Sequence, residues 1–139
     1  MSLAFSAGLQ ARVYERLVGD AGLSALVGGA IYDAPLMPAT EAAPDFVTLG
    51  EETVRANDTK TSVGAIHDFT VTVHSERDGF DAAKRIAAAV CACLVDAPLV
   101  LEAGRLVALR FMRAGAKRGP APEKRKVTLR FRAIVDHEG

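Results

Sequence analysis

The sequence predicts an α+β protein in which an antiparallel or mixed sheet of four strands, or slightly more, carries helices mainly on one face. Two observations lead to this class. Residues 66–75 alternate apolar and polar side chains, as in a strand with one buried face. Residues 80–94 then repeat apolar side chains at helical spacing, and small residues among them let this helix lie close to a sheet. The expected order of elements is α-β-β-α-β-β.

Composition limits the class of protein. The chain has 139 residues, half of them hydrophobic, so we expect one domain over residues 1–139. Its 17 basic and 17 acidic side chains cancel, and no run approaches the roughly 18 consecutive apolar residues of a membrane span. The N-terminus lacks the basic and apolar regions of a signal peptide. Cys91 and Cys93 point about 200° apart on the predicted helix, so we expect small buried or half-buried residues in a reducing compartment and neither a disulfide between them nor a shared metal.

The first part of the chain predicts helices and short extended pieces. Apolar residues recur every four positions at Phe5, Leu9, Val13 and Leu17. This spacing indicates an amphipathic helix that ends at Gly19. A short second helix or turn is expected over 23–27, and a brief extended piece at 31–32. The proline-dense stretch 35–44 is expected to be an ordered loop, because proline suits neither a helix interior nor a central strand.

A first strand is expected over 46–50. The acidic pair Glu51 and Glu52 marks its exit, although Val54 is a candidate for its continuation. Residues 57–64 are polar and carry no apolar period, which is typical of a loop tip.

The second half predicts a helix and a closing hairpin. Ser75 or Asp78 is the expected cap of the helix over 80–94. Two short extended runs and a loop follow, at 99–101, 106–112 and 115–123. The clearest strand is 127–135, where Val127, Leu129, Phe131, Ala133 and Val135 share one face and Thr128, Arg130 and Arg132 share the other. We expect its apolar face, and that of 66–75, to lie under the helix.

Charge is segregated along the chain. Residues 1–104 hold 14 acidic and 7 basic side chains, whereas residues 105–132 hold 10 basic side chains and only one acidic side chain. Three interpretations stay open: a solvated hairpin, a surface that faces DNA, or an edge that docks on an acidic neighbour of the same kind. Stacking on single-stranded nucleic acid is disfavoured, because aromatic residues do not alternate with the basic ones. The candidate interface or channel residues are Arg110, Arg113, Lys117, Arg118, Lys124, Arg125 and Lys126.

No catalytic motif is evident. The three histidines are His67, His74 and His137. Pairing His74 with Ser75, or His67 with Asp68, fails because neighbours on a strand point to opposite faces. Glycine-rich phosphate loops, nucleophile elbows and paired metal-ligand motifs are absent from the sequence. We therefore predict no enzyme activity, no cofactor and no metal.

Three segments resemble a family of small tail-completion proteins, the tail terminators of long-tailed bacteriophages, prophages and gene transfer agents, long labelled as of unknown function. The runs 31–35 and 43–50 are similar to its "VYD-x-x-P … P-x-V-x-L-G" opening. Residues 69–94 resemble its strand, "W-S-x-x-x-G" motif and amphipathic helix, with His74 where many members have Trp. The closing strand is similar to its "L-x-F-R-A" signature.

The resemblance implies a structural virion protein. Such a terminator caps the tail tube as a hexameric ring and joins it to the head-side connector, so its partners would be itself, the major tail tube protein and the connector. DNA would pass through the ring, which would lie at the head-proximal end of a tail assembled in the bacterial cytoplasm. The family supplies no catalytic residues. The alternative is a small nucleic-acid- or protein-binding module that uses the basic segment 105–132.

Overall fold

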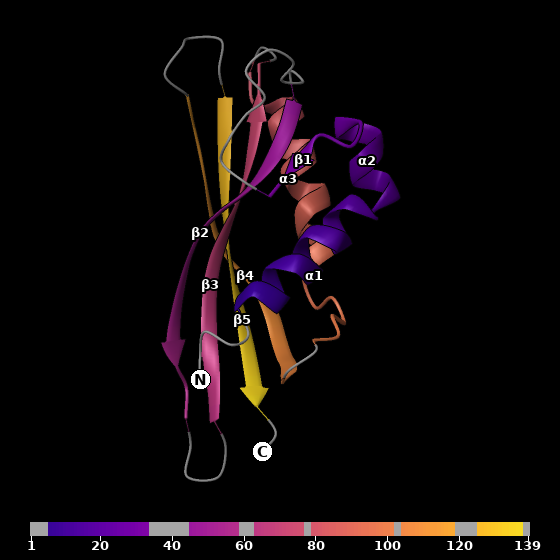
Figure 1. Cartoon of the computed structure of the whole chain (residues 1–139). Helices are drawn as coiled ribbons and strands as arrows, with labels where there is room; N and C mark the ends of the chain where they lie inside the picture. Colours follow the sequence, from indigo (N-terminus) through magenta and orange to yellow (C-terminus); the bar gives the residue numbers. More distant parts are fainter. Residues whose placement is uncertain are drawn as a thin grey trace.

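The computed structural model describes residues 6–33, 45–58, 63–76, 79–101, 104–118 and 125–137. These parts of the chain form three helices and five strands, which are labelled in Figure 1. In order they are α1 (Ser6–Val18), α2 (Ala21–Val27), β1 (Ile31–Tyr32), β2 (Asp45–Ala56), β3 (Val63–Ser75), α3 (Asp81–Leu94), β4 (Arg105–Arg118) and β5 (Arg125–His137). The predicted α+β class is confirmed. The predicted order leaves out α2 and β1, although the short helix or turn expected over 23–27 and the extended piece expected at 31–32 match them.

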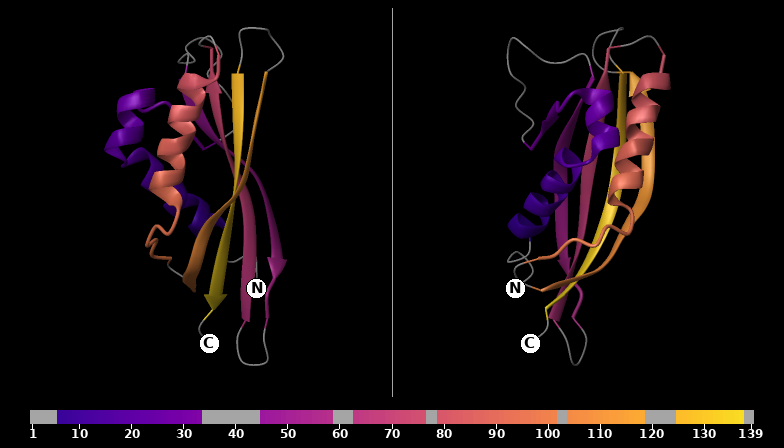
Figure 2. Two further views of the ribbon diagram at one scale, coloured as in Figure 1. Left: turned by 180° about the vertical axis from the view of Figure 1, so that it is seen from behind. Right: turned by 90° about the vertical axis from the view of Figure 1, so that its right-hand side faces the viewer.

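The strands form one mixed sheet in the order β1-β2-β3-β5-β4. Only the β1–β2 pairing is parallel, and the other three are antiparallel. The sheet is strongly twisted, and all three helices lie on one of its faces (Figure 2). The prediction of helices on one face is therefore confirmed, with a fifth strand at one edge.

Local sequence explains the helices. The Asp20 side chain caps α2 by accepting a hydrogen bond from the Leu23 N–H (2.8 Å). The same helix ends at Gly28, whose φ of 62° is left-handed and whose N–H donates to the Ser24 carbonyl. The predicted cap of α3 by Ser75 is wrong. Ser75 ends β3 and donates to the Asp45 carboxylate on the adjacent strand (2.6 Å), while the alternative cap Asp78 lies outside the described residues.

The core lies between the helices and the sheet. Phe131 is fully buried at its centre, with Phe69 stacked on it at a centroid distance of 5.6 Å. The predicted apolar faces of 66–75 and 127–135 both point into this core, and small α3 residues such as Ala83 and Ala87 bring the helix close. Cys91 and Cys93 are free thiols, as predicted, and burial raises the pKa of both.

Several predicted boundaries are wrong at strand ends. β2 does not end at Glu51 and Glu52 but passes them through a bulge and pairs with β3 up to Ala56. β3 begins at Val63, inside the predicted loop tip. β4 continues through the predicted loop start at Gly115 to Arg118. Pairing with a neighbouring strand holds these segments extended, although the added parts of β2 and β4 are largely exposed.

Two further stretches complete the comparison with the predictions. The run 99–101 is not a strand, because no strand pairs with it among the described parts of the chain. The proline-rich loop prediction falls largely on 34–44, and the second half of the 115–123 loop prediction falls on 119–124. Both lie outside the described residues.

Candidate functional site

No helix among the described residues covers the sheet face opposite the core, called here the helix-free face (Figure 2). Residues paired across antiparallel strands have side chains on the same face, so the strand register assigns its members. On β5, Phe131 and Leu129 point to the helices, and Arg130 and Arg132 therefore point away. The charged members of this face are Arg55, Asp68, Arg105, Arg110, Arg113, Lys117, Lys126, Arg130, Arg132 and Asp136.

The two carboxylates of the helix-free face each pair with an arginine. Arg132 donates two hydrogen bonds to Asp68, from Nε at 2.8 Å and from Nη2 at 3.2 Å. These bonds hold the pKa of Asp68 below its usual value and raise the pKa of Arg132. Arg105 lies 3.6 Å from Asp136. The two acidic groups that the strand register assigns to this face are thus matched by two of its eight cations, and Arg55 and Arg130 also help to lower the pKa of Asp68 through longer-range attraction.

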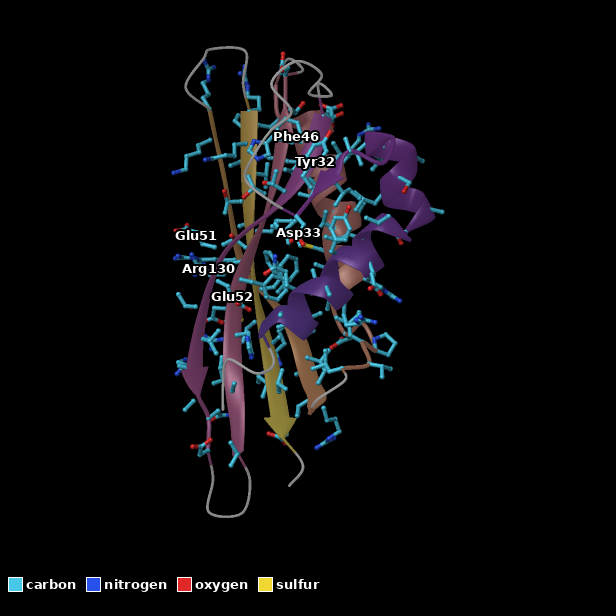
Figure 3. All side chains as sticks on the ribbon, in the orientation of Figure 1. Tyr32, Asp33, Phe46, Glu51, Glu52 and Arg130 are labelled. Atoms are coloured by element: carbon cyan, nitrogen blue, oxygen red, sulfur yellow. The ribbon has the colours of Figure 1, made fainter. Side chains whose placement is uncertain are left out.

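Six cations of this face form no ion pair with any residue that the structure describes. They are Arg55, Arg110, Arg113, Lys117, Lys126 and Arg130, called here the unpaired cations. All are exposed or half-exposed. Glu51 lies on the same side of the sheet as Arg130 in Figure 3 and lowers the local charge, but the face stays clearly basic.

Like charges lie directly opposite one another on β4 and β5. Cα pairs join Arg110 with Arg132, Arg113 with Arg130, and Lys117 with Lys126. A register shift between Phe111 and Arg113 makes this possible, because the extra residue at 112 returns Arg113 to the face of Arg110. Cross-strand like charges are unfavourable, so this arrangement costs stability in the free subunit.

The structure divides the seven residues predicted as an interface or channel between the two faces. Arg110, Arg113, Lys117 and Lys126 belong to the helix-free face. The Arg118–Arg125 pair lies on the helix side, where the Arg125 guanidinium is 5.6 Å from the centroid of the Phe80 ring. Lys124 lies outside the described residues.

The predicted set lacks four cations of the helix-free face, which are Arg55, Arg105, Arg130 and Arg132. Arg130 and Arg132 carry a clear signal, since they alternate with the apolar face of the last strand. Arg55 has no such signal, because it is the one cation of its strand and the strand predicted from the sequence ends before it. The helix-free face therefore unites cations from β2, β4 and β5.

Both edges of the sheet are open to another strand in the described structure. β4 pairs only with β5, and residues 110–118 are exposed along their whole length. On the other edge β1 pairs only with Val47 and Thr48, so β2 has no outer partner from Gly50 to Ala56. Long unpaired edges are surfaces on which another chain can dock.

An apolar groove of about 330 Å³ runs between α3 and β4. Ala87, Ala88 and Cys91 line it from the helix, and Phe111, Ala114 and Ala116 line it from the strand. Phe111 is 43% exposed and Met112 beside it is 42% exposed. Exposed apolar side chains concentrated at one edge are typical of a protein–protein contact.

The histidines serve packing and hydrogen bonding. His67 is buried, with Nδ1 3.2 Å from a Glu52 carboxylate oxygen. His74 stacks on Phe46 at a centroid distance of 4.3 Å, and its Nε2 is 3.1 Å from the Thr48 hydroxyl. Within the described ranges, no three His, Cys, Asp or Glu side chains gather closely enough to hold a metal ion. None of the helices that the structure describes is long and apolar enough to cross a membrane.

Comparison with known proteins agrees with the sequence resemblance. The family model described as "Tail completion protein gp17" matches residues 11–136. Among solved structures, a chain from "Virion of native gene transfer agent (GTA) particle" is 47% identical, with a TM-score of 0.87, over 97% of this chain and 99% of that one. The search of curated proteins gives no match. The predicted resemblance is confirmed: this chain belongs to the tail completion protein gp17 family.

Proposed function

We propose that this protein is the tail terminator of a phage-like particle, and that six copies close into a ring that caps the tail tube and joins it to the head-side connector. Membership of a tail completion family supports a structural role in a virion tail rather than an enzymatic one. The match at 47% identity to a chain of a gene transfer agent virion supports the same role. The ring would lie at the head-proximal end of a tail assembled in the cytoplasm.

The observation that carries the ring is the pair of unlike open edges. A closed ring needs two different, complementary surfaces on each subunit. β4 carries five cations and no acidic residue, whereas the open part of β2 from Gly50 to Ala56 carries Glu51 and Glu52 against Arg55. The two edges therefore attract each other across a subunit boundary.

Strand direction also suits closure. Three antiparallel pairings separate β2 from β4, so the two edge strands run in opposite directions within one subunit. Rotation about an axis along the strands keeps these directions. β4 of one copy would therefore lie antiparallel to β2 of the next copy, which is the geometry of an ordinary antiparallel ladder.

Apolar contact would strengthen the joint. The groove beside Ala114 and Ala116 opens at the same edge as β4. Phe111 and Met112 add exposed apolar surface there. Burying such surface contributes about 25 cal/mol per Å², so even a modest contact would stabilise the ring.

A charge placed in the groove tests the proposal. Ala116→Glu should prevent ring formation while leaving the subunit folded, because Ala116 is exposed in the free chain. Val100→Glu is the matched control, since Val100 is 81% exposed and does not line the groove. Native mass spectrometry of the protein alone and with purified tail tubes would report the assembly state.

Imaging of intact particles tests the position. The protein should appear as a six-fold ring at the junction of tail and head. A chain that stays monomeric with tubes present, and that is missing from this junction, would contradict the proposal. Equal assembly of both variants would contradict the β4 joint alone.

A further inference from the structure

We propose that the helix-free face binds the phosphate backbone of double-stranded DNA. Its six unpaired cations are the contacts: Arg55 of β2 and Arg110, Arg113 and Lys117 of β4 are exposed, and Lys126 and Arg130 of β5 are half-exposed. The inference rests on the proposed function only for the place where the protein would meet DNA, which is the channel of the ring. The binding itself needs only the surface of one subunit.

The spacing of the cations suits a polyanion. Neighbouring strands lie about 4.8 Å apart, and residues on one face of a strand recur about every 6.7 Å. Three cross-strand rows of cations on β4 and β5 form an open grid, in which the uncharged Gly115–Thr128 pair separates the second row from the third, and Arg55 on β2 extends it across the sheet. Such a grid can meet several phosphates at once from one face of the sheet.

The like-charged rows also point to an anionic ligand. Arg113 opposite Arg130, and Lys117 opposite Lys126, repel each other in the free subunit. A bound phosphate between such a pair removes the repulsion and releases counterions. A face that only needed to be soluble would gain more from alternating charges, as Arg132 and Asp68 show on the same face.

Duplex DNA fits this face better than a single strand. The aromatic residues of the face among the described residues are Tyr32, Phe46 and His74, which pack on one another: Phe46 is 8% exposed and stacked on His74, and the half-buried Tyr32 ring lies 6.0 Å from that of Phe46. Unstacked bases would therefore find no platform here. A sheet face from which no described element protrudes also cannot enter a groove deeply, so the expected contacts are to phosphate and carry no sequence preference.

The salt dependence of DNA binding tests this assignment. The probe is a fluorescein-labelled 30-base-pair duplex, titrated with the full-length protein between 50 and 200 mM NaCl while anisotropy is recorded. The test variant carries Arg110→Gln, Arg113→Gln and Lys117→Gln. The control variant carries Arg12→Gln, Lys84→Gln and Arg85→Gln, which remove the same charge from the helices on the other side of the sheet.

Three lost phosphate contacts should make the slope of log K against log salt less negative by about 2.7, at about 0.9 per contact. Over this fourfold salt range the test variant should therefore lose about 40-fold less affinity than the wild type. The control variant should keep the wild-type slope. Circular dichroism of both variants would verify that they are folded.

Each other result overturns the proposal. The proposal is wrong if the wild-type protein does not bind the duplex at 50 mM NaCl. It is also wrong if the two variants change the salt dependence of binding equally. A test variant that binds DNA like the wild type but fails to join tails would assign the face to an acidic protein instead. Ring formation is measured separately by mass, so a monomer with the expected slopes would support this inference while contradicting the ring.

Discussion

The two faces of the sheet differ in the side chains that they carry and in what those side chains do for stability. On β5 the side chains of Leu129 and Phe131 are buried under the helices, and those of Arg130 and Arg132 between and beside them point to the helix-free face. The first face gathers apolar surface and gives the fold its stability. The second face gathers like charges that cost stability. The contrast teaches that the strands hold the fold with one face and leave the other free for recognition.

The largest expected effect is on the covered face. Phe131→Ala should lower the free energy of unfolding by about 3–5 kcal/mol, because it opens a cavity beside Phe69 and Phe111. Its neighbour Arg130→Ala should change stability by less than about 0.5 kcal/mol. Urea denaturation followed by circular dichroism measures both. Similar losses for the two variants would break the distinction between the faces.

A smaller effect is expected where two backbones approach closely. A Cβ on Gly64 would lie 2.7 Å from the Val135 carbonyl oxygen, and a backbone atom cannot move aside easily. Gly64→Ala should therefore cost about 1–3 kcal/mol. Gly115→Ala on β4 meets nothing within 4 Å and should be neutral or slightly stabilising. A cost at Gly115 equal to that at Gly64 would show that β4 is packed more tightly than its exposure indicates.

The Asp68–Arg132 pair gives a pH-dependent effect on the helix-free face. Because Arg132 lowers the pKa of Asp68, the ionised carboxylate stabilises the fold above the ordinary carboxyl pKa of about 3.9. That contribution is lost as pH falls toward the lowered pKa. Asp68→Asn should cost about 1 kcal/mol at pH 7, a modest value because the pair is partly exposed. Thermal unfolding from pH 7 to pH 3 should show the two proteins converging, and a constant gap would exclude this role.

The sequence predicts the covered face much better than the helix-free one. A buried face requires apolar residues at regular spacing in the sequence. This spacing makes α1, α3, β3 and the apolar side of β5 predictable. The end of β4 is exposed on both faces, and after Glu52 in β2 only Val54 is half-buried, on the helix side, so apart from Val54 their side chains form no apolar pattern that predicts a strand. The small element β1 is held by pairing with β2 rather than by its own pattern.

The candidate site shows the same limit. The excess of basic residues is visible in the sequence, but their division between faces depends on the β4 register. Simple alternation places Arg110 and Arg113 on opposite faces. The bulge at 112 brings them to the same face. A bulge depends on how two strands pair, and the residue types alone do not predict it.

The smallest expected effect separates stability from recognition on the helix-free face. Arg113→Gln removes one member of the like-charged pair with Arg130. It should raise the free energy of unfolding by about 0.2–1 kcal/mol at low salt, because the repulsion disappears. In 1 M NaCl the Debye length is about 3 Å, so the gain should vanish there. The same substitution should weaken duplex binding, and the two effects therefore have opposite signs. Arg85→Gln is the control, since it breaks an exposed pair with Asp81 and should slightly lower stability without changing DNA affinity. Urea melts at the two salt concentrations, with anisotropy titrations of the same samples, measure both quantities. If Arg113→Gln lowers stability at low salt, then Arg113 has a favourable partner in the subunit, and the face is not held in an arrangement that an anion would relieve.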